Sequence, residues 1–181
     1  MAVKTFTTGE VLTSTDTNTY LTNAGLVYIK SQTIGTSVSS VPITGAFSGD
    51  YDNYKIVVSG GVGSSAQFLR LQLGGATGAY YSGYAAVNYA TNATENSNVN
   101  NGSLFSNAGI MSTSNLNMNV EVFSPYLTKA TYVSGSIATG GRGGSFAGFL
   151  DDSVSYTSFT ISPASGTMTG GTVTVYGYRK A

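Results

Sequence analysis

The stretch that decides the fold is LNMNVEV, residues 116–122, in which apolar and polar side chains alternate without a break. Every second residue is apolar: Leu116, Met118, Val120 and Val122. A period of two is that of a β-strand with one buried face, because successive side chains of a strand point to opposite sides. The stretch therefore predicts a strand whose even-numbered side chains enter a core and whose odd-numbered ones face solvent.

The same alternation recurs along most of the chain after residue 41, at 54–58, 69–73, 132–138, 154–161 and 172–178. Glycine pairs separate these runs and mark turns between strands. We take the GGRGG run around Arg142 as such a turn. About eight alternating strands, without a later helical pattern, predict an antiparallel β-sandwich or barrel. A jelly roll is the first choice because some connections are long.

A different pattern precedes the strands, in FTTGEVLTSTDTNTYLTNAGLVYI, residues 6–29. Ser14 is a suitable helix N-cap, Asp16 favours a first turn, and Gly25 can end the helix. A helix of about ten Thr- and Asn-rich residues is too weak to stand alone in water. We therefore expect this segment to pack against a partner, either its own body, a sister subunit or a larger particle.

The chain is thus expected to have an N-terminal anchor, 1–35, built from an extended segment and a short helix, and a β-sandwich body, 36–181. The polar run 31–40 is interpreted as the connection between them. The side chains expected to make the anchor's buried contacts are Phe6, Val11, Leu12, Tyr20 and Leu21.

Charge is scarce, at 9% of residues, and eight Lys and Arg balance eight Asp and Glu. This balance excludes the basic surface typical of nucleic-acid binding. A neutral, hydroxyl-rich surface favours burial in an assembly, although a secreted or surface protein with hydroxyl-rich strands is the alternative. The N-terminus has no signal-peptide pattern, and the longest apolar runs fall far short of a membrane span.

The chemistry of enzymes is poorly represented, because the chain has no Cys, His or Trp. Neither Glu121 nor the Asp151-Asp152 pair has an evident catalytic partner, so we expect no enzymatic activity and no cofactor. The residues Asp50, Asp52 and Asn53 offer oxygen ligands at loop spacing, but this run lacks the remaining features of a calcium loop. We interpret it as a turn before a strand and expect no metal site.

Two features are candidates for surface recognition. The Asn-rich run 90–107 lacks alternation and predicts a long surface loop, with Asn98 and Asn101 as candidate contacts. Four tyrosines precede it, and tyrosine can stack on sugar rings or fill an interface. A solvated loop without a partner and tyrosines in a β core are the alternatives. The four tyrosines are Tyr80, Tyr81, Tyr84 and Tyr89.

Two pieces of the chain resemble proteins of tailed-phage virions. Residues 9–29, GEVLTSTDTNTYLTNAGLVYI, are similar to the Gly-x-x-Leu-Thr-Ala-x-Asp-x-Asn-Thr-Tyr-Leu segment of phage tail-fibre and related virion proteins, although Ser14 and Thr15 stand where small helix formers are usual. Residues 47–60 and 170–181 are similar to the sandwich domain that often follows this segment in marine and cyanobacterial phages. The matching residues of the first piece are Gly9, Leu12, Thr13, Asp16, Asn18, Thr19, Tyr20 and Leu21.

The resemblance implies a non-enzymatic virion structural protein, made in the host cytoplasm and assembled into the particle as a homotrimer. Its N-terminal segment would dock on other virion proteins, and its sandwich would project for assembly or for attachment to host surface glycans. We expect a tail fibre or tail-tip adhesin. A capsid-decorating or head-fibre protein is the first alternative, and a carbohydrate-binding module of cellular origin is the second. Neither membrane insertion nor nucleic-acid binding is expected.

Overall fold

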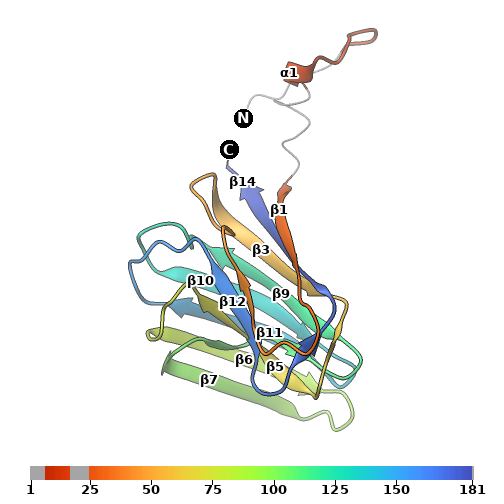
Figure 1. Cartoon of the computed structure of the whole chain (residues 1–181), viewed down its shortest axis with the longest axis vertical. Coiled ribbons are helices and arrows are strands. Elements are labelled where there is room, and N and C mark those ends of the chain that lie inside the picture. Colours follow the sequence, from red (N-terminus) through yellow and green to blue (C-terminus); the bar gives the residue numbers. More distant parts are fainter. Residues whose placement is uncertain (1–6, 17–24, 181) are drawn as a thin grey trace.

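The computed structural model describes residues 7–16 and 25–180 of the 181-residue chain. Figure 1 shows a β-sandwich, with the short helix α1 (Ser14–Asp16) lying clear of it. No helix among the described residues has the length and apolar character needed to cross a membrane. The strands are β1 (Leu26–Thr33), β2 (Val41–Ile43), β3 (Tyr51–Ser59), β4 (Val62–Gly63), β5 (Gln67–Leu73), β6 (Tyr80–Asn88), β7 (Thr94–Gly102), β8 (Phe105–Met111), β9 (Leu116–Phe123), β10 (Thr131–Ala138), β11 (Arg142–Leu150), β12 (Phe159–Pro163), β13 (Met168–Thr169) and β14 (Thr172–Arg179).

Twelve of these strands form one antiparallel sheet that folds over into two layers. The larger layer has the order β1-β14-β3-β9-β10-β11-β6-β7, and the smaller has the order β2-β12-β5-β8. The layers join at β9, whose first residues Leu116 and Asn117 pair with β8, whereas 118–123 pair with β3. The short strands β4 and β13 pair with each other. The fold is therefore an all-β sandwich, as the alternation predicted.

The strand order is that of an extended jelly roll. In the smaller layer, the first strand of the roll, β2, lies beside the last, β12, and β5 lies beside β8. In the larger layer, the β9-β10-β11 meander lies between β3 and β6, where a minimal jelly roll has a single strand. The strands β14 and β1 extend the layer beyond β3. The jelly-roll-like expectation is thus confirmed, with four additional strands in the larger layer.

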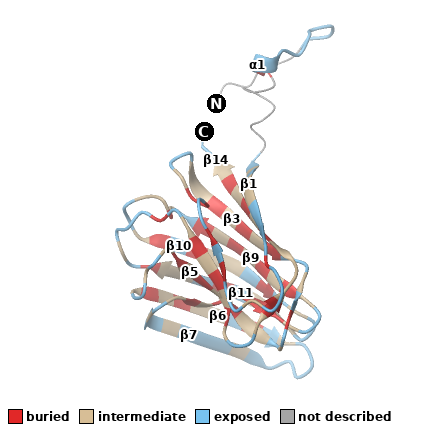
Figure 2. Cartoon of the chain, in the orientation of Figure 1, coloured by how far each residue is buried: buried red, intermediate tan, exposed pale blue. Residues whose placement is uncertain are grey.

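The core lies between the layers and is lined by the residues that the alternation selected. On β9, Leu116, Met118, Val120 and Val122 are all buried, and the polar residues between them are half-buried on the other face. Aromatic rings fill the space between the layers. The centroid of the Phe105 ring lies 4.8 Å from that of Tyr80 and 6.1 Å from that of Phe146. Figure 2 shows this core as the buried stripes that run along the inner faces of the strands. The largest fully buried side chains include Tyr54, Tyr80, Phe105, Phe146, Phe159, Ile43 and Ile56.

The Asn-rich run 90–107 is not the long loop that we expected. Thr94–Gly102 is the strand β7, and β8 begins at Phe105. Strand β7 is the edge of the larger layer and, among the described strands, pairs with β6 alone, so most of its side chains are exposed (Figure 2). A strand that buries neither face needs no apolar alternation, and this explains why the sequence pattern missed it.

The glycines that follow Arg142 lie in a strand, although we expected them in a turn. The turn comprises residues 139–141, and β11 begins at Arg142. A Cβ atom on Gly144 would stand 2.0 Å from the carbonyl oxygen of Ala85 on β6. Glycine is therefore required here by the close approach of the neighbouring backbone.

Two further boundaries differ from the expectation. The run 31–40 is not wholly a connection, because β1 continues to Thr33 and pairs with β14 over its whole length. Strand β1, which we placed in the N-terminal anchor, therefore belongs to the sandwich. The run 154–161 contains a strand only from Phe159 onward, and Val154 lies exposed in the irregular connection before it.

Candidate functional site

The N-terminal segment begins its helix with a capping box. The backbone N–H of Asp16 donates to Oγ1 of Thr13 at 3.1 Å, and the backbone N–H of Thr13 donates to Oδ2 of Asp16 at 3.2 Å. The Thr13 hydroxyl also donates to Oδ2 of Asp16 at 2.6 Å. This reciprocal arrangement satisfies N–H groups at the helix start. The N-cap is therefore Thr13, one residue before the Ser14 that we expected.

Two of the expected anchor residues lie in the described part of this segment, and both face solvent. Val11 is 80% exposed and Leu12 is 48% exposed. Phe6, Tyr20 and Leu21 lie outside the described residues. Gly25 has a φ of 70°, and β1 begins directly after it. The segment is thus joined to the sandwich through a strand that is itself part of the larger layer.

Four aromatic side chains form a row across the outer face of the larger layer, which we call the aromatic row: Tyr81, Phe149, Tyr132 and Phe123. Each is directly opposite the next on the neighbouring strand, in the order β6, β11, β10, β9. The rings of Tyr81 and Phe149 stack at 4.9 Å, and those of Phe149 and Tyr132 at 5.8 Å. Tyr132 is 56% exposed and Phe123 is 37% exposed. Cross-strand aromatic pairs of this kind stabilise a sheet, yet here the row also presents its rings to solvent.

The row is interrupted at β3, where the residue opposite Phe123 is Asn53. A surface hollow of about 420 Å³ lies at this point, lined by Asn53, Glu121, Phe123 and Tyr178; we call it the Asn53 hollow. Tyr178 lies on β14 at a β-bulge, between Gly177, which pairs with Tyr54, and Arg179. The hollow therefore has an amide and a carboxylate between two aromatic side chains.

The polar groups of the Asn53 hollow are held by contacts between three strands. Nζ of Lys55 on β3 lies 2.7 Å from Oε1 of Glu121 on β9, and the Tyr178 hydroxyl donates to Oε2 of Glu121 at 2.5 Å. Burial raises the pKa of Tyr178 to about 12, with further contributions from the hydrogen bond to Glu121 and from the charge of that carboxylate. The side-chain amide of Asn53 has no hydrogen-bond partner within the described part of the chain. Glu121 is thus fixed in place, whereas Asn53 is available to a ligand.

The tyrosines singled out in the sequence do not form one surface. Tyr80 is not a recognition residue: it is fully buried, and its hydroxyl accepts a hydrogen bond from the backbone N–H of Leu73 at 2.9 Å. Tyr84 is half-buried and packs on Phe68 with ring centroids 4.9 Å apart. Tyr89 is exposed near the end of β6, and Tyr81 alone belongs to the aromatic row.

The two asparagines singled out both lie on the exposed edge strand β7. Asn98 is exposed and pairs with Gly83 of β6. Asn101 has a φ of 55°, and its Oδ1 accepts a hydrogen bond from the backbone N–H of Ala79 at 3.1 Å. Asn101 therefore links the end of β7 to the residue that precedes β6, and neither asparagine contributes to the Asn53 hollow.

The Asp50–Asn53 run behaves as a turn followed by a strand. The Ser48 hydroxyl donates to Oδ2 of Asp50 at 3.0 Å, and Oδ1 of Asp52 lies 2.8 Å from Nζ of Lys180. Asn53 lies on β3, in the hollow described above. Within residues 7–16 and 25–180, no group of three or more acidic side chains is placed to hold a metal ion.

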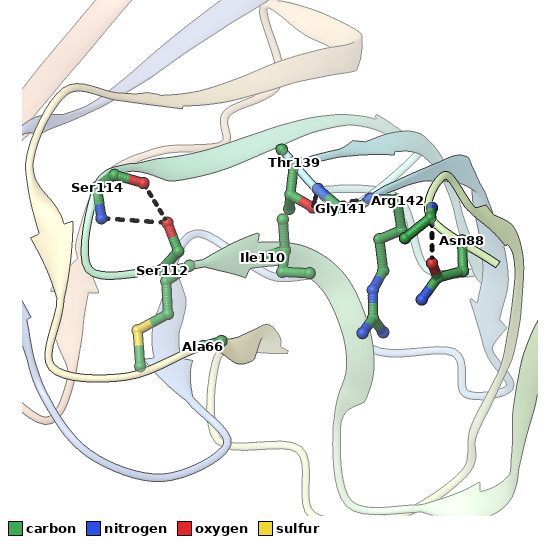
Figure 3. A pocket seen from close by; sticks show the side chains of 11 residues that line it. Ala66, Asn88, Ile110, Ser112, Ser114, Thr139, Gly141 and Arg142 are labelled. Carbon is green, nitrogen blue, oxygen red and sulfur yellow. Dashed lines mark hydrogen bonds between the residues drawn. The ribbon is translucent and has the colours of Figure 1, made fainter.

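A second hollow lies at the opposite end of the strands, among three hairpin turns (Figure 3). It measures about 410 Å³ and includes Ala66, Ile110, Ser112, Thr139 and Arg142 in its lining. Its polar atoms already stabilise the turns: Oγ1 of Thr139 accepts from the N–H groups of Gly141 and Arg142, and Oγ of Ser112 accepts from the N–H groups of Ser114 and Asn115.

The charged side chain of this second hollow, Arg142, is already paired within the protein. Nη1 of Arg142 lies 2.7 Å from Oε2 of Glu95 on β7, and the Asn88 amide donates to Oε1 of the same carboxylate at 3.1 Å. The guanidinium also lies over the Phe68 ring, 5.9 Å from its centroid. Because these polar groups are satisfied internally, the Asn53 hollow is the stronger candidate site.

Sequence reasoning singled out Asn53 and Glu121 of the Asn53 hollow, for other roles, and missed Phe123 and Tyr178. The alternation in 116–122 correctly placed Glu121 on the outer face, and the same parity predicts an outward Phe123. The two residues that bind Glu121 are far from it in the sequence: Lys55 is 66 residues away and Tyr178 is 57. Their proximity therefore depends on the strand order. No protein-family model matches the chain, and comparisons with curated proteins and with solved structures give no match either.

Proposed function

We propose that this chain is a non-enzymatic structural protein of a tailed-phage virion, most specifically a tail-fibre or tail-tip protein. Residues 1–24 dock on other virion proteins, and the sandwich projects as a homotrimer that contacts the host surface. The observation that carries the proposal is the pair of exposed apolar side chains, Val11 and Leu12, directly before a capped helix start. Apolar side chains left in water at a marginal helix favour a partner that covers them.

The composition supports the same assignment. Only 9% of the residues are charged, and their charges cancel. Such a surface gives little repulsion between copies, which suits a protein that works inside an assembly. Residues 9–29 resemble the N-terminal segment of phage fibre proteins, and this resemblance is the reason for proposing that the segment binds the virion. A capsid-decorating position would use the same segment, and only its location on the particle would differ.

The experiment that tests the proposal changes one apolar side chain in the anchor and one in the body. Leu12→Asp should prevent incorporation into particles, because it places a charge in the docking contact. Val154→Asp is the matched control, since Val154 is 51% exposed, similar to Leu12 at 48%, but lies on the sandwich. Both variants should unfold at the same urea concentration as the unmodified chain. Particles that incorporate Leu12→Asp at normal levels would exclude this docking role.

Carbohydrate recognition by the sandwich is the second candidate function. The Asn53 hollow favours it, because aromatic rings beside an amide and a carboxylate are the groups that contact sugars. This function is compatible with the first, since a fibre that reaches a host surface meets glycans there.

A further inference from the structure

We propose that the Asn53 hollow binds a neutral pyranose ring, placed between Phe123 and Tyr178 above the amide of Asn53. The inference rests on the proposed attachment function only for the source of the sugar, a host surface glycan. The binding chemistry itself is carried by the hollow and can be tested on the isolated chain.

The first argument is the gap in the aromatic row. The aromatic row occupies one position on each of four neighbouring strands, β6, β11, β10 and β9. At the next position, on β3, the residue opposite Phe123 is Asn53 and not an aromatic residue. Tyr178 follows on β14, so two strand spacings separate its strand from that of Phe123. The Tyr178 side chain reaches across β3 to Glu121 on β9, so the space that remains open is the hollow lined by Asn53, Glu121, Phe123 and Tyr178.

The second argument is the shape and volume of the gap. It is a solvent-accessible hollow of about 420 Å³, and all four lining residues come from β14, β3 and β9, the second, third and fourth strands of the larger layer. This volume lies within the roughly 300–1,000 Å³ of small-ligand pockets. A site built on strands is also held more firmly than one built on loops.

The third argument is the hydrogen-bonding capacity of the hollow. The Asn53 side chain offers a carbonyl oxygen and an NH₂ group, neither of which is used by another described residue. Each oxygen of the Glu121 carboxylate accepts one hydrogen bond, from Lys55 or from Tyr178, and keeps a second lone pair. Sugar hydroxyls need both donors and acceptors, and a wholly apolar guest would leave the Asn53 amide unpaired.

The fourth argument is charge. The carboxylate of Glu121 lines the hollow, whereas the ammonium of Lys55 is already paired with it. An acidic sugar would bring a second carboxylate close to Glu121, whose own charge the Lys55 ammonium already balances. The hollow therefore selects a neutral sugar over an acidic one. An aromatic side chain of a second copy would fit the walls but not the polar floor.

The test uses the full-length chain and the methyl glycosides of glucose, galactose and N-acetylglucosamine, with methyl glucuronide as the acidic counterpart. Saturation-transfer NMR at millimolar sugar should detect at least one neutral pyranoside, and the glucuronide should bind at least tenfold more weakly. Asn53→Phe fills the gap and should weaken binding at least tenfold. Asn98→Phe is the matched control on the exposed edge strand and should leave binding unchanged.

A second variant guards against misfolding, because Asn53→Phe adds a large side chain to a strand. Phe123→Ala removes one wall of the hollow and should also weaken binding at least tenfold, with each variant checked by its urea unfolding midpoint. The proposal is overturned if no neutral pyranoside binds at millimolar concentration, or if the glucuronide binds as tightly. It is also overturned if Asn53→Phe binds normally.

Particle experiments separate this inference from the proposed function. If the chain is absent from virions, the docking role fails, whereas sugar binding by the isolated chain can still be measured. If Asn53→Phe particles contain normal amounts of the chain and adsorb poorly to cells, the sugar site is supported. If instead Asn53→Phe dissociates the oligomer or prevents incorporation, the hollow is a protein contact and the sugar proposal is overturned.

Discussion

The hydroxyl of Tyr178 on β14 donates a 2.5 Å hydrogen bond to Oε2 of Glu121 on β9, across the intervening strand β3. Lys55 on β3 binds the other oxygen of the same carboxylate at 2.7 Å. Three neighbouring strands are thus linked by one acidic side chain on the outer face of the sheet. This link fixes the position of the Tyr178 ring and so defines one wall of the Asn53 hollow.

The first prediction concerns the pH dependence that this link produces. The pKa of Tyr178 is raised from 10.0 to about 12, with burial as the largest cause and the Glu121 hydrogen bond next. Below pH 10 the phenol is protonated in both the folded and the unfolded chain. Between pH 10 and 12 the unfolded chain releases this proton while the folded chain retains it, so the free energy of unfolding falls as pH rises.

Glu121→Gln should move the pKa of Tyr178 back toward 10 and make this fall in stability shallower. The shift should be partial, because burial remains. Phenolate absorbance and urea midpoints across this pH range measure both effects. Asp52→Asn is the control, since Asp52 pairs with Lys180 at 2.8 Å and not with Tyr178. An unchanged Tyr178 pKa in Glu121→Gln would contradict the assigned interaction.

The second prediction concerns the helix start. Thr13→Ala removes the acceptor of the Asp16 N–H and should destabilise the first turn by about 1 kcal/mol. Ser14→Ala should have little effect, because Ser14 is the first helical residue and not the cap. Backbone chemical shifts of residues 13–16 in the full-length chain report the loss, and the sandwich should keep its unfolding midpoint. A larger effect from Ser14→Ala would restore Ser14 as the cap.

The third prediction concerns the approach of β11 to β6. Gly144→Ala would place a Cβ 2.0 Å from the Ala85 carbonyl oxygen and 2.5 Å from the Ala86 Cα, so we expect a loss of stability of about 1–3 kcal/mol or more. Gly140→Ala adds the same atom in the preceding turn, where nothing lies within 4 Å, and should change stability by less than about 0.5 kcal/mol. Equal urea midpoints for the two variants would show that the strands can separate without cost.

The fourth prediction locates the boundary of the sandwich. A chain that begins at residue 25 keeps β1 and should fold with a nearly normal urea midpoint. A chain that begins at residue 34 lacks β1 and leaves one edge of β14 unpaired. At about 0.5–1.5 kcal/mol per lost hydrogen bond, it should lose several kcal/mol, and its bare edge should promote aggregation. If both truncations are equally stable, β1 contributes nothing to the fold.

The sequence predicted the parts of the fold in which one strand face is buried and the other is wet. Leu116–Phe123 is the clearest example, because its alternation reports burial directly. Strand β7 could not be found in this way, since neither of its faces is buried. Strand β8 has the opposite difficulty: nearly all of its residues are buried, so its burial does not alternate. Gly144 fits a strand only because β6 lies so close, which is a property of the packed sheet.

The candidate site shows the same division. Glu121 was placed on the outer face from its position in the alternation, but its partners depend on β3, β9 and β14 being neighbours. Asp50, Asp52 and Asn53 were grouped by sequence spacing, yet they have separate roles in the structure. Asp50 lies in a turn, Asp52 forms an ion pair with Lys180, and Asn53 lines the Asn53 hollow. The four tyrosines near residue 85 are divided between the core and the surface for a similar reason. Proximity along the chain did not predict proximity in space.

The most direct measurement of the central claim is electron cryo-microscopy of the phage particles that we propose contain this chain. We predict density for the sandwich projecting from the virion, with Val11 and Leu12 buried against a neighbouring virion protein. A chain that is absent from purified particles would contradict the proposed function, as would one with Val11 and Leu12 facing solvent.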